Sequence, residues 1–315
     1  MRFAIYGSGG VGGYFGARLA DAGEDVTFIA RGDHLAAIQR DGLTVKSING
    51  DLHLDKAQAS DDPATIGVVD VVIVAVKAWQ VEEIAKTMAP LIGPATLVLP
   101  LENGVEATDV LGDAVGHDKV LRGLCGILAY REAPGVIRHA GVEPFVRFGE
   151  ADNRQSERTQ RVKAAFDKAA GVTAEIPDDI QVAVWSKFLF ICAMSGVGAV
   201  TRAPMGVSRQ LAESRRLLEE VMEEITAVGR ARGVALPDDA VAKALKFIDT
   251  LPENSTASMQ RDIMDGLPSE LESQNGAVVR LGKAAGVATP INAAIYAALL
   301  PQEARARGQI VFDDR

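Results

Sequence analysis

Residues 1–31 read MRFAIYGSGGVGGYFGARLADAGEDVTFIAR, and this stretch decides the fold. Residues 3–6 are a short apolar run, typical of a buried parallel strand. Six residues that match the pattern G-x-G-x-x-G follow at once: Gly7, Ser8, Gly9, Gly10, Val11 and Gly12. Apolar residues then recur at helical spacing, which predicts a helix over residues 11–22 that ends at Gly23. Residues 25–30 read as a second strand, so we expect a β-α-β unit that binds a dinucleotide through this glycine loop.

Three of the loop glycines have separate predicted roles. Gly7 permits the tight turn, Gly9 lets backbone N–H groups approach a pyrophosphate, and Gly12 lets the helix pack close to the strand. The plain alternative is a glycine turn that binds nothing. Gly13 and Gly16 argue against that alternative, because each glycine inside a helix costs about 1 kcal/mol relative to alanine.

The end of the second strand predicts which dinucleotide binds. Sites that are specific for NAD place Asp or Glu there to hold the ribose 2′-hydroxyl. This chain has Arg31 and Gly32 after Ala30. A guanidinium can bind two oxygens of a 2′-phosphate at once. The sequence therefore favours NADP, the alternative being that Arg31 is a solvated surface residue.

The composition is that of a soluble globular protein with room for two domains. The chain has 315 residues, of which 48% are hydrophobic and 24% charged. Its net charge of −9 and the lack of a basic run argue against nucleic acid and anionic membranes as partners. The two cysteines and four histidines form no metal-binding pattern, so no metal is expected. Cys125 and Cys192 lie in apolar surroundings, and no signal peptide is apparent, so we expect a cytoplasmic protein.

Polar residues follow two further predicted strands, over residues 70–76 and 95–100. Lys77 and Gln80 come after the first of these strands, and Asn103 comes after the second. In an open α/β sheet, ligands lie beyond the carboxyl ends of the strands. We therefore expect these three side chains on the same side of the sheet as the glycine loop.

The rest of the N-terminal half reads as small β elements and a helix. A hairpin is predicted around Asn49 and Gly50, between residues 43–46 and 52–54. Short spacing predicts an antiparallel extension of the sheet by three more strands, at residues 120–130, 135–139 and 144–148. A helix over residues 154–170 and a strand over residues 172–176 precede Pro177. We place a domain boundary there, which gives a dinucleotide-binding domain over residues 1–177 and a substrate and dimerisation domain over residues 178–315.

The second domain is predicted to be all-helical. Its six expected helices cover residues 180–200, 208–232, 238–251, 257–265, 269–285 and 289–306. The first is almost wholly apolar and about long enough to span a bilayer. Lys187 lies near its middle, where insertion of a lysine costs roughly 2.5–3.5 kcal/mol, so a buried core helix is favoured.

Lys187 is also the most informative charge of this domain, because no other ionisable residue lies between residues 180 and 200. Burial lowers the pKa of a lysine and lets it donate a proton near neutral pH. Alternatively, the stem is buried and the ammonium reaches water; the periodicity does not decide between these. Two polar segments, residues 255–262 and 268–272, are further candidates for the site, but helix capping alone explains both and is the preferred interpretation.

Along essentially its whole length the chain resembles the ketopantoate reductase (2-dehydropantoate 2-reductase) family. The matching motifs are specific through their order and spacing, and they are Gly7 to Gly12, Arg31, Lys77-Ala78-Trp79-Gln80, Asn103-Gly104, Trp185-Ser186-Lys187, Ser258 to Asp262, Ser269-Glu270 and Asn275-Gly276. The resemblance implies an α/β fold, with an N-terminal Rossmann-type NADP-binding domain and an all-helical C-terminal domain. It also implies reduction of a 2-oxo acid to a 2-hydroxy acid, namely 2-dehydropantoate to pantoate in pantothenate biosynthesis.

The resemblance assigns roles by position. The glycine loop, Arg31, Lys77, Gln80 and Asn103 would bind the cofactor, and Asn103 would lie beside both the nicotinamide and the substrate. Lys187 would protonate the oxygen as hydride reaches the keto carbon. Ser258 and Glu270 would bind polar groups of the substrate, and Glu270 would tune Lys187.

Three expected substrate-binding positions depart from the family pattern. Ile191, Ser195 and Ser255 stand where the family usually has asparagine, so part of the polar contact with substrate is missing. A paralogous reductase of another small 2-oxo or 3-oxo acid is therefore an alternative. A non-catalytic NADPH sensor is another, and the presence of Lys187 and Glu270 argues against it. Apolar helices such as residues 291–300 could supply a homodimer surface.

Overall fold

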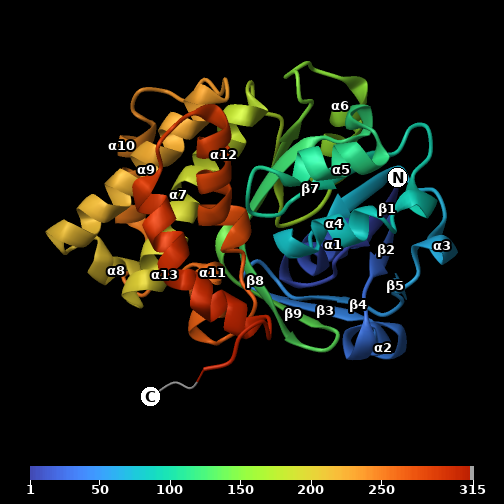
Figure 1. Cartoon of the computed structure of the whole chain (residues 1–315). Coiled ribbons are helices and arrows are strands. Elements are labelled where there is room, and N and C mark those ends of the chain that lie inside the picture. The colour runs from blue at the N-terminus through green and yellow to red at the C-terminus, as the bar shows by residue number, and fades with distance from the viewer. Residues whose placement is uncertain (313–315) are drawn as a thin grey trace. The chain divides into compact units, whose positions relative to one another are not determined.

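The structure is a computed structural model of the chain, and it describes residues 1–312 (Figure 1). The chain forms two compact units. The first comprises Met1–Glu102 and Ala107–Ala183, and the second comprises Asn103–Glu106 and the chain from Val184 onward. The units therefore divide inside a helix, whereas the boundary predicted from the sequence precedes that helix and stays a prediction.

A parallel sheet forms the centre of the first unit. Its strands are β1 (Arg2–Tyr6), β2 (Asp25–Ile29), β5 (Gln58–Ser60), β6 (Val71–Val74) and β7 (Leu97–Pro100), in the spatial order β5-β2-β1-β6-β7. All four pairings are parallel. This order is that of the first five strands of a dinucleotide-binding doubly wound fold.

Both faces of this sheet are covered, which explains why its strands are continuously apolar. Within β1, Phe3 and Ile5 belong to one buried cluster, while Ala4 and Tyr6 belong to another. Alternate side chains of a strand point to opposite faces, so apolar residues at every position require packing on both sides. Buried residues of α1 (Gly10–Asp21) and α2 (Gly32–Asp41) belong to the first cluster, and those of α4 (Val81–Ala85) and α5 (Ala107–Val115) belong to the second. The unit also contains α3 (Pro63–Ile66) and α6 (Glu157–Asp167).

A second sheet lies in the same unit, and here the prediction of one extended sheet was wrong. Its strands are β3 (Leu43–Ser47), β4 (Leu52–Leu54), β8 (Arg122–Ala133), β9 (Val136–Gly149) and β10 (Thr173–Glu175). The predicted hairpin of β3 and β4 is present and antiparallel, and β8 pairs antiparallel with β9. The two segments predicted as separate strands, 135–139 and 144–148, both fall within β9 except for Gly135, which lies in the turn before it.

Helix α1 explains why there are two sheets instead of one. A Cβ on Gly12 would lie 2.8 Å from Ile5 of β1, and a Cβ on Gly13 would lie 2.7 Å from Ile137 of β9. The helix is thus packed against β1 on one side and β9 on the other, and residues of both sheets share one buried cluster. Since the β8–β9 hairpin covers α1, it does not continue the parallel sheet.

The described part of the second unit, up to residue 312, contains helices and no strand. Its elements are α7 (Ile180–Thr201, which begins in the first unit), α8 (Met205–Ser208), α9 (Ala212–Ala231), α10 (Ala240–Thr250), α11 (Ser258–Met264), a π-helical turn (Glu272–Gly276), α12 (Ala277–Ala285) and α13 (Pro290–Ala306). Two expected helices differ from the prediction. The helix predicted over residues 208–232 begins only at Ala212, because Ser208 ends the separate helix α8. The helix predicted over residues 269–285 has the π turn before α12.

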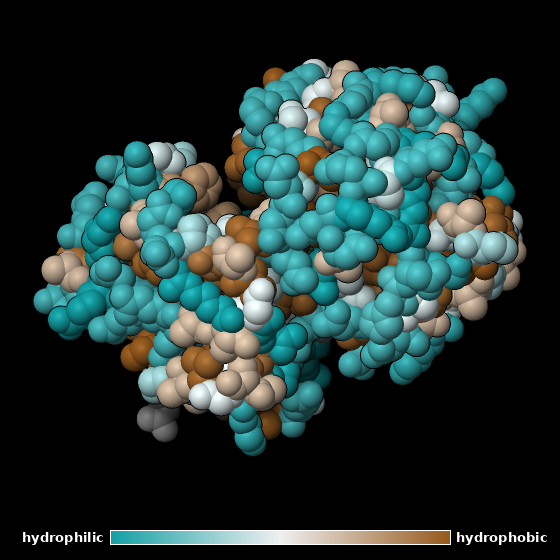
Figure 2. Space-filling view, turned by 90° about the horizontal axis from the view of Figure 1, so that it is seen from above, coloured by the Kyte–Doolittle hydropathy of each residue, from teal (hydrophilic) through white to brown (hydrophobic). Residues whose placement is uncertain are grey.

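Helix α7 is the central element of this unit. Gly196 and Gly198 let the side chains of Asn275 and Gln260 approach its backbone, because a Cβ at either glycine would come within 2.7 Å of those amides. Its length and apolar composition would let it cross a membrane, yet 61% of its most apolar window is buried inside the protein. The face of the molecule in Figure 2 is mainly hydrophilic, with apolar residues scattered among polar ones. A core helix accounts for the apolar character of α7.

Candidate active site

The glycine loop between β1 and α1 has the geometry that its pattern predicts. Gly7 has φ +96°, and a Cβ there would lie 2.8 Å from the carbonyl oxygen of Ala75. A Cβ on Gly12 would lie only 2.0 Å from the carbonyl oxygen of Gly7. Gly9 is different, because nothing lies within 4 Å of the position its Cβ would take. The loop is therefore closed on the protein side and open beside Gly9.

The start of α1 is suited to an anion. Gly9 is the N-cap of α1, and the first turn of the helix contains no acidic residue. The first N–H groups of a helix have no partner within the helix, and the helix dipole favours negative charge at this end. Ser8 is buried, with its Oγ 3.4 Å from the carbonyl oxygen of Ile29. The open space at Gly9 and these N–H groups together fit the pyrophosphate of a dinucleotide.

Arg31 follows β2, as its position in the sequence predicts, and it is the N-cap residue of α2, without a side-chain capping bond. Its side chain is 61% exposed, and its Nη1 lies 3.4 Å from Oε1 of Glu83, which is equally exposed. An exposed ion pair of this length contributes little, because water and salt screen it. The guanidinium is therefore available to a ligand that carries more negative charge than one carboxylate.

Lys77 and Gln80 are brought together by the turn after β6. The backbone N–H of Lys77 donates to Oε1 of Gln80 at 3.2 Å. The Gln80 oxygen thus stabilises its own turn, a local role that the sequence pattern did not indicate. Both residues are half-buried.

Lys187 lies on α7 at the border between buried and exposed residues. Trp185 and Phe188 are buried and in edge-to-face contact, Ser186 is exposed, and Lys187 is half-buried. One helical turn further on, Ile191 is also half-buried. Ser195 has no exposed surface, and its Oγ has no hydrogen-bond partner within residues 1–312. The hydroxyl of Ser195 is therefore enclosed by the protein.

Two predicted residues that are far apart in sequence meet in the second unit. The Nδ2 of Asn103 donates to Oε2 of Glu270 at 3.2 Å, and Glu270 is only 4% exposed. The chain enters the π turn immediately after Glu270, with the N–H of Gly276 bonded to the carbonyl of Leu271 at 3.0 Å. Such π turns often occur at functional sites. The coupling of Glu270 to Lys187 stays a prediction.

A buried carboxylate, missed in the sequence, fixes the segment that carries Glu270. Glu303 of α13 is 5% exposed and accepts hydrogen bonds from the backbone N–H and the hydroxyl of Ser269. It also accepts from Nε of Arg307 at 2.6 Å, while Arg307 donates to the carbonyl of Ser269 at 3.1 Å. Ser269 is therefore a structural residue. Its partners follow it by more than thirty positions, so no local signal could have revealed them.

The two remaining predicted serines lie near the start of α11. Ser258 is the first residue of that helix and is half-buried. Ser255 is also half-buried, and its carbonyl accepts from the N–H of Met205 at 2.9 Å. The backbone of Ser255 thus connects α8 to the segment before α11, and the role of both hydroxyls stays a prediction.

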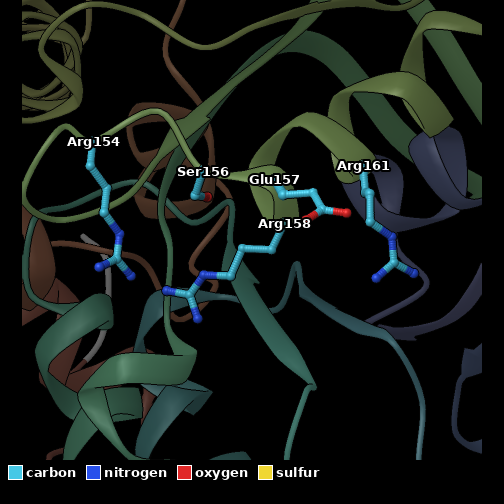
Figure 3. Close-up of a pocket in the computed structure, with 5 residues that line it drawn as sticks. All are labelled: Arg154, Ser156, Glu157, Arg158 and Arg161. Atoms are coloured by element: carbon cyan, nitrogen blue, oxygen red, sulfur yellow. The ribbon is translucent and has the colours of Figure 1, made fainter.

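A surface cavity of about 400 Å³ in the first unit contains none of the predicted residues (Figure 3). It is lined by Arg154, Ser156, Glu157, Arg158 and Arg161. The guanidinium of Arg158 bonds to the buried Glu150, with Nε 2.6 Å from Oε1, and to the carbonyl of Asp118. These contacts hold the start of α6 in place. The cavity therefore lies beside an ion pair with a structural role, and none of the predicted site residues lines it.

The parallel sheet with its open glycine loop has the arrangement of a dinucleotide-binding domain. A family model described as "Ketopantoate reductase PanE/ApbA" matches residues 3–153, and one described as its C-terminal part matches residues 179–303. The chain belongs to the ketopantoate reductase family. This confirms the predicted family, the fold class and the assignment as an enzyme.

The chain is similar to the following three proteins over nearly its whole length. "Uncharacterized oxidoreductase YkpB" of Bacillus subtilis is 30% identical, over 96% of this chain and 99% of its own. The crystal structure of a 2-dehydropantoate 2-reductase from Geobacter metallireducens has a TM-score of 0.89 and 30% identity, over 96% of this chain and 99% of its own. The ternary structure of D-mandelate dehydrogenase with NADH has a TM-score of 0.86, covering 98% of this chain and 99% of its own. Its identity is only 23%, so it shows the shared fold alone.

Proposed function

We propose that this chain reduces a 2-oxo acid to the 2-hydroxy acid with NADPH, and that 2-dehydropantoate is the first substrate to test. The observation that carries the proposal is the hydrogen bond between Asn103 and the buried Glu270. Asn103 and Glu270 are distant in sequence but belong to the same unit, the helical one that is expected to hold the substrate. A contact between two such residues supports a catalytic role for both segments.

The reaction needs a hydride, a proton and a site that tolerates the developing charge. A bound reduced nicotinamide would supply the hydride to the keto carbon, which turns the carbonyl oxygen into an alkoxide. The ammonium of Lys187 would stabilise that oxygen and give it the proton, so that the product is an alcohol. Asn103, Ser258 and Glu270 would orient the acid. The glycine loop, Arg31, Lys77 and Gln80 would hold the dinucleotide.

NADPH is proposed because of Arg31, whose exposed guanidinium can bind a 2′-phosphate. We also propose that the protein is cytoplasmic, that it forms a homodimer and that it acts in pantothenate biosynthesis. These proposals rest on the sequence and on the family.

The substrate itself depends on what Ile191, Ser195 and Ser255 can contact. Ile191 offers no hydrogen bond, and the Ser195 hydroxyl is enclosed by protein. A site that lacks a partner for a substrate hydroxyl leaves that group unpaired. A 2-oxo acid without a 4-hydroxyl should therefore match or exceed 2-dehydropantoate, which makes a paralogous reductase the second candidate.

The test is NADPH oxidation with a panel of 2-oxo acids that includes a matched pair. 2-Dehydropantoate and 3,3-dimethyl-2-oxobutanoate differ only in the 4-hydroxyl, so the ratio of their kcat/KM values measures the contribution of that group. We expect turnover of both, with a ratio near or below one. A preference for 2-dehydropantoate above about a thousandfold would show a specific hydroxyl site. Binding of NADPH without turnover of any acid would instead indicate a sensor.

A further inference from the structure

His34 makes an unusual pair of contacts for a residue on a helix that begins at the surface. It lies on α2 and is only 4% exposed. Its Nε2 is 2.8 Å from the carbonyl oxygen of Ser8 in the glycine loop, and its Nδ1 accepts the backbone N–H of Gly135 at 2.9 Å. Gly135 lies in the turn between β8 and β9. One imidazole thus bonds to two backbone segments that are distant in sequence.

These contacts determine the tautomer. A backbone N–H can only donate, so Nδ1 must be the unprotonated nitrogen that accepts it. In the neutral ring the proton is then on Nε2, which donates to the Ser8 carbonyl. Burial lowers the pKa of His34, and the nearby Arg131 lowers it further, while the Ser8 carbonyl and Asp33 act in the opposite direction.

The bond to Ser8 sets the direction of the next peptide group. The described chain contains no cis peptide bond, so the carbonyl of Ser8 and the N–H of Gly9 point to opposite sides of their peptide plane. Since the carbonyl points to His34, the Gly9 N–H points away from it. Gly9 is the N-cap of α1, beside the open space at the start of that helix.

We infer that His34 is a positioning residue for the dinucleotide site, holding the glycine loop in the orientation that presents its N–H groups to the pyrophosphate. This inference rests on the proposed function, because it assumes that the loop binds a dinucleotide. In this role His34 would act through its bond to the Ser8 carbonyl, not through contact with cofactor or substrate. Its loss should therefore weaken cofactor binding and leave the chemical step unchanged.

Two substitutions separate the two hydrogen bonds. In His34→Gln the terminal amide is as far from Cβ as Nε2 is, so it can still donate to the Ser8 carbonyl. In His34→Asn the amide is only as far from Cβ as Nδ1 is, so it can accept from Gly135 but cannot reach Ser8. His117→Gln is the control, because His117 is an exposed histidine of the same unit.

Titration calorimetry measures the dissociation constants of NADPH and NADH. Steady-state kinetics at saturating cofactor, with the best acid of the panel, measures kcat. We expect about tenfold weaker binding of both dinucleotides by His34→Asn, and binding within about threefold of wild type by His34→Gln and by His117→Gln. The kcat of all three variants should stay near that of wild type. Equal affinities of the Asn and Gln variants would overturn the role of His34.

A wild type that binds neither dinucleotide would overturn the proposed function itself, so the two failures are distinguishable. A second measurement covers the case in which His34→Asn does not fold. Long-range ¹H–¹⁵N spectra of the wild-type imidazole should show Nε2 protonated and Nδ1 unprotonated at neutral pH. The opposite tautomer, or a charged ring, would overturn the inference without any cofactor.

Discussion

Lys187 is the residue on which the proposed chemistry depends. It is half-buried, and its aromatic neighbours in the sequence, Trp185 and Phe188, are buried. Lys187→Ala should lower kcat by about 10²–10⁴, the usual contribution of a positioned acid, with NADPH affinity unchanged. Steady-state kinetics and a separate NADPH titration measure the two effects. Ser186→Ala is the control, because Ser186 is the exposed neighbour; near-normal turnover by a folded Lys187→Ala would contradict the role.

Substitutions of Arg31 and of Glu83 should change the affinity for NADPH in opposite directions. Arg31→Ala should weaken NADPH by about tenfold to a hundredfold and leave NADH almost unchanged, because only NADPH carries the 2′-phosphate. Glu83→Gln should strengthen NADPH by up to about fivefold, since the carboxylate 3.4 Å from Arg31 no longer competes for it. Dissociation constants of both dinucleotides, measured for each variant, test this pair. Equal losses of NADPH and NADH in Arg31→Ala would show a structural role.

At the level of elements, two glycines of the β1–α1 connection should have different roles, Gly12 in the stability of the fold and Gly9 in ligand binding. A Cβ on Gly12 would lie 2.0 Å from a backbone oxygen, whereas one on Gly9 would touch nothing within 4 Å. Gly12→Ala should therefore destabilise the protein by about 1–3 kcal/mol, while Gly9→Ala should leave stability within about 0.5 kcal/mol. Gly9→Ala should nevertheless weaken the dinucleotide at least tenfold or so, because the methyl group occupies the open space. Urea unfolding measures the stability of both variants, and NADPH titration measures their affinity for the cofactor. A Gly9→Ala variant that binds NADPH normally would place the pyrophosphate elsewhere.

The elements that the sequence predicted well are those specified by neighbouring residues. The β1–α1–β2 unit follows from an apolar run, a glycine pattern and helical spacing within thirty-one residues. The second sheet does not follow in this way, because β3 pairs with β9 through contacts such as Val45 with Ile137. No local pattern shows which distant strand will be the partner. The hairpin of β8 and β9 was therefore recognised, but it was assigned to the wrong sheet.

The same distinction applies to the site. Motif positions such as Arg31 and Asn103 could be named from the sequence because their spacing from a strand end is fixed. His34 and Glu303 could not, since their roles depend on Gly135 and Ser269, which are distant in sequence. Ser195 was expected to contact substrate, and only the structure shows how completely it is enclosed.

For the molecule as a whole, the titrating groups predict two steps in stability as the pH falls. The pKa of His34 lies below its ordinary value of 6.5, first because of burial. Between the pKa of folded His34 and the ordinary value of 6.5, the unfolded chain binds a proton that the folded chain does not. Stability therefore falls as the pH drops through this range. The carboxylates act at lower pH. Arg138, followed by Lys46, lowers the pKa of Glu132 to about 2, so its contribution is present above the ordinary value of 4.5 and is lost as the pH falls toward 2.

Glu150 should contribute to the second step. Burial alone would raise the pKa of Glu150, but the hydrogen bonds from Arg158 and Ser156 outweigh burial and lower it. The free energy of unfolding in urea should therefore be level above about pH 7, fall between about pH 6.5 and the pKa of folded His34, and fall again below about pH 4.5. His34→Gln removes the first step and should flatten the profile between about pH 6.5 and the pKa of folded His34, whereas the control His117→Gln should not. A His34→Gln profile with the wild-type slope over that range would mean that His34 is not the titrating group.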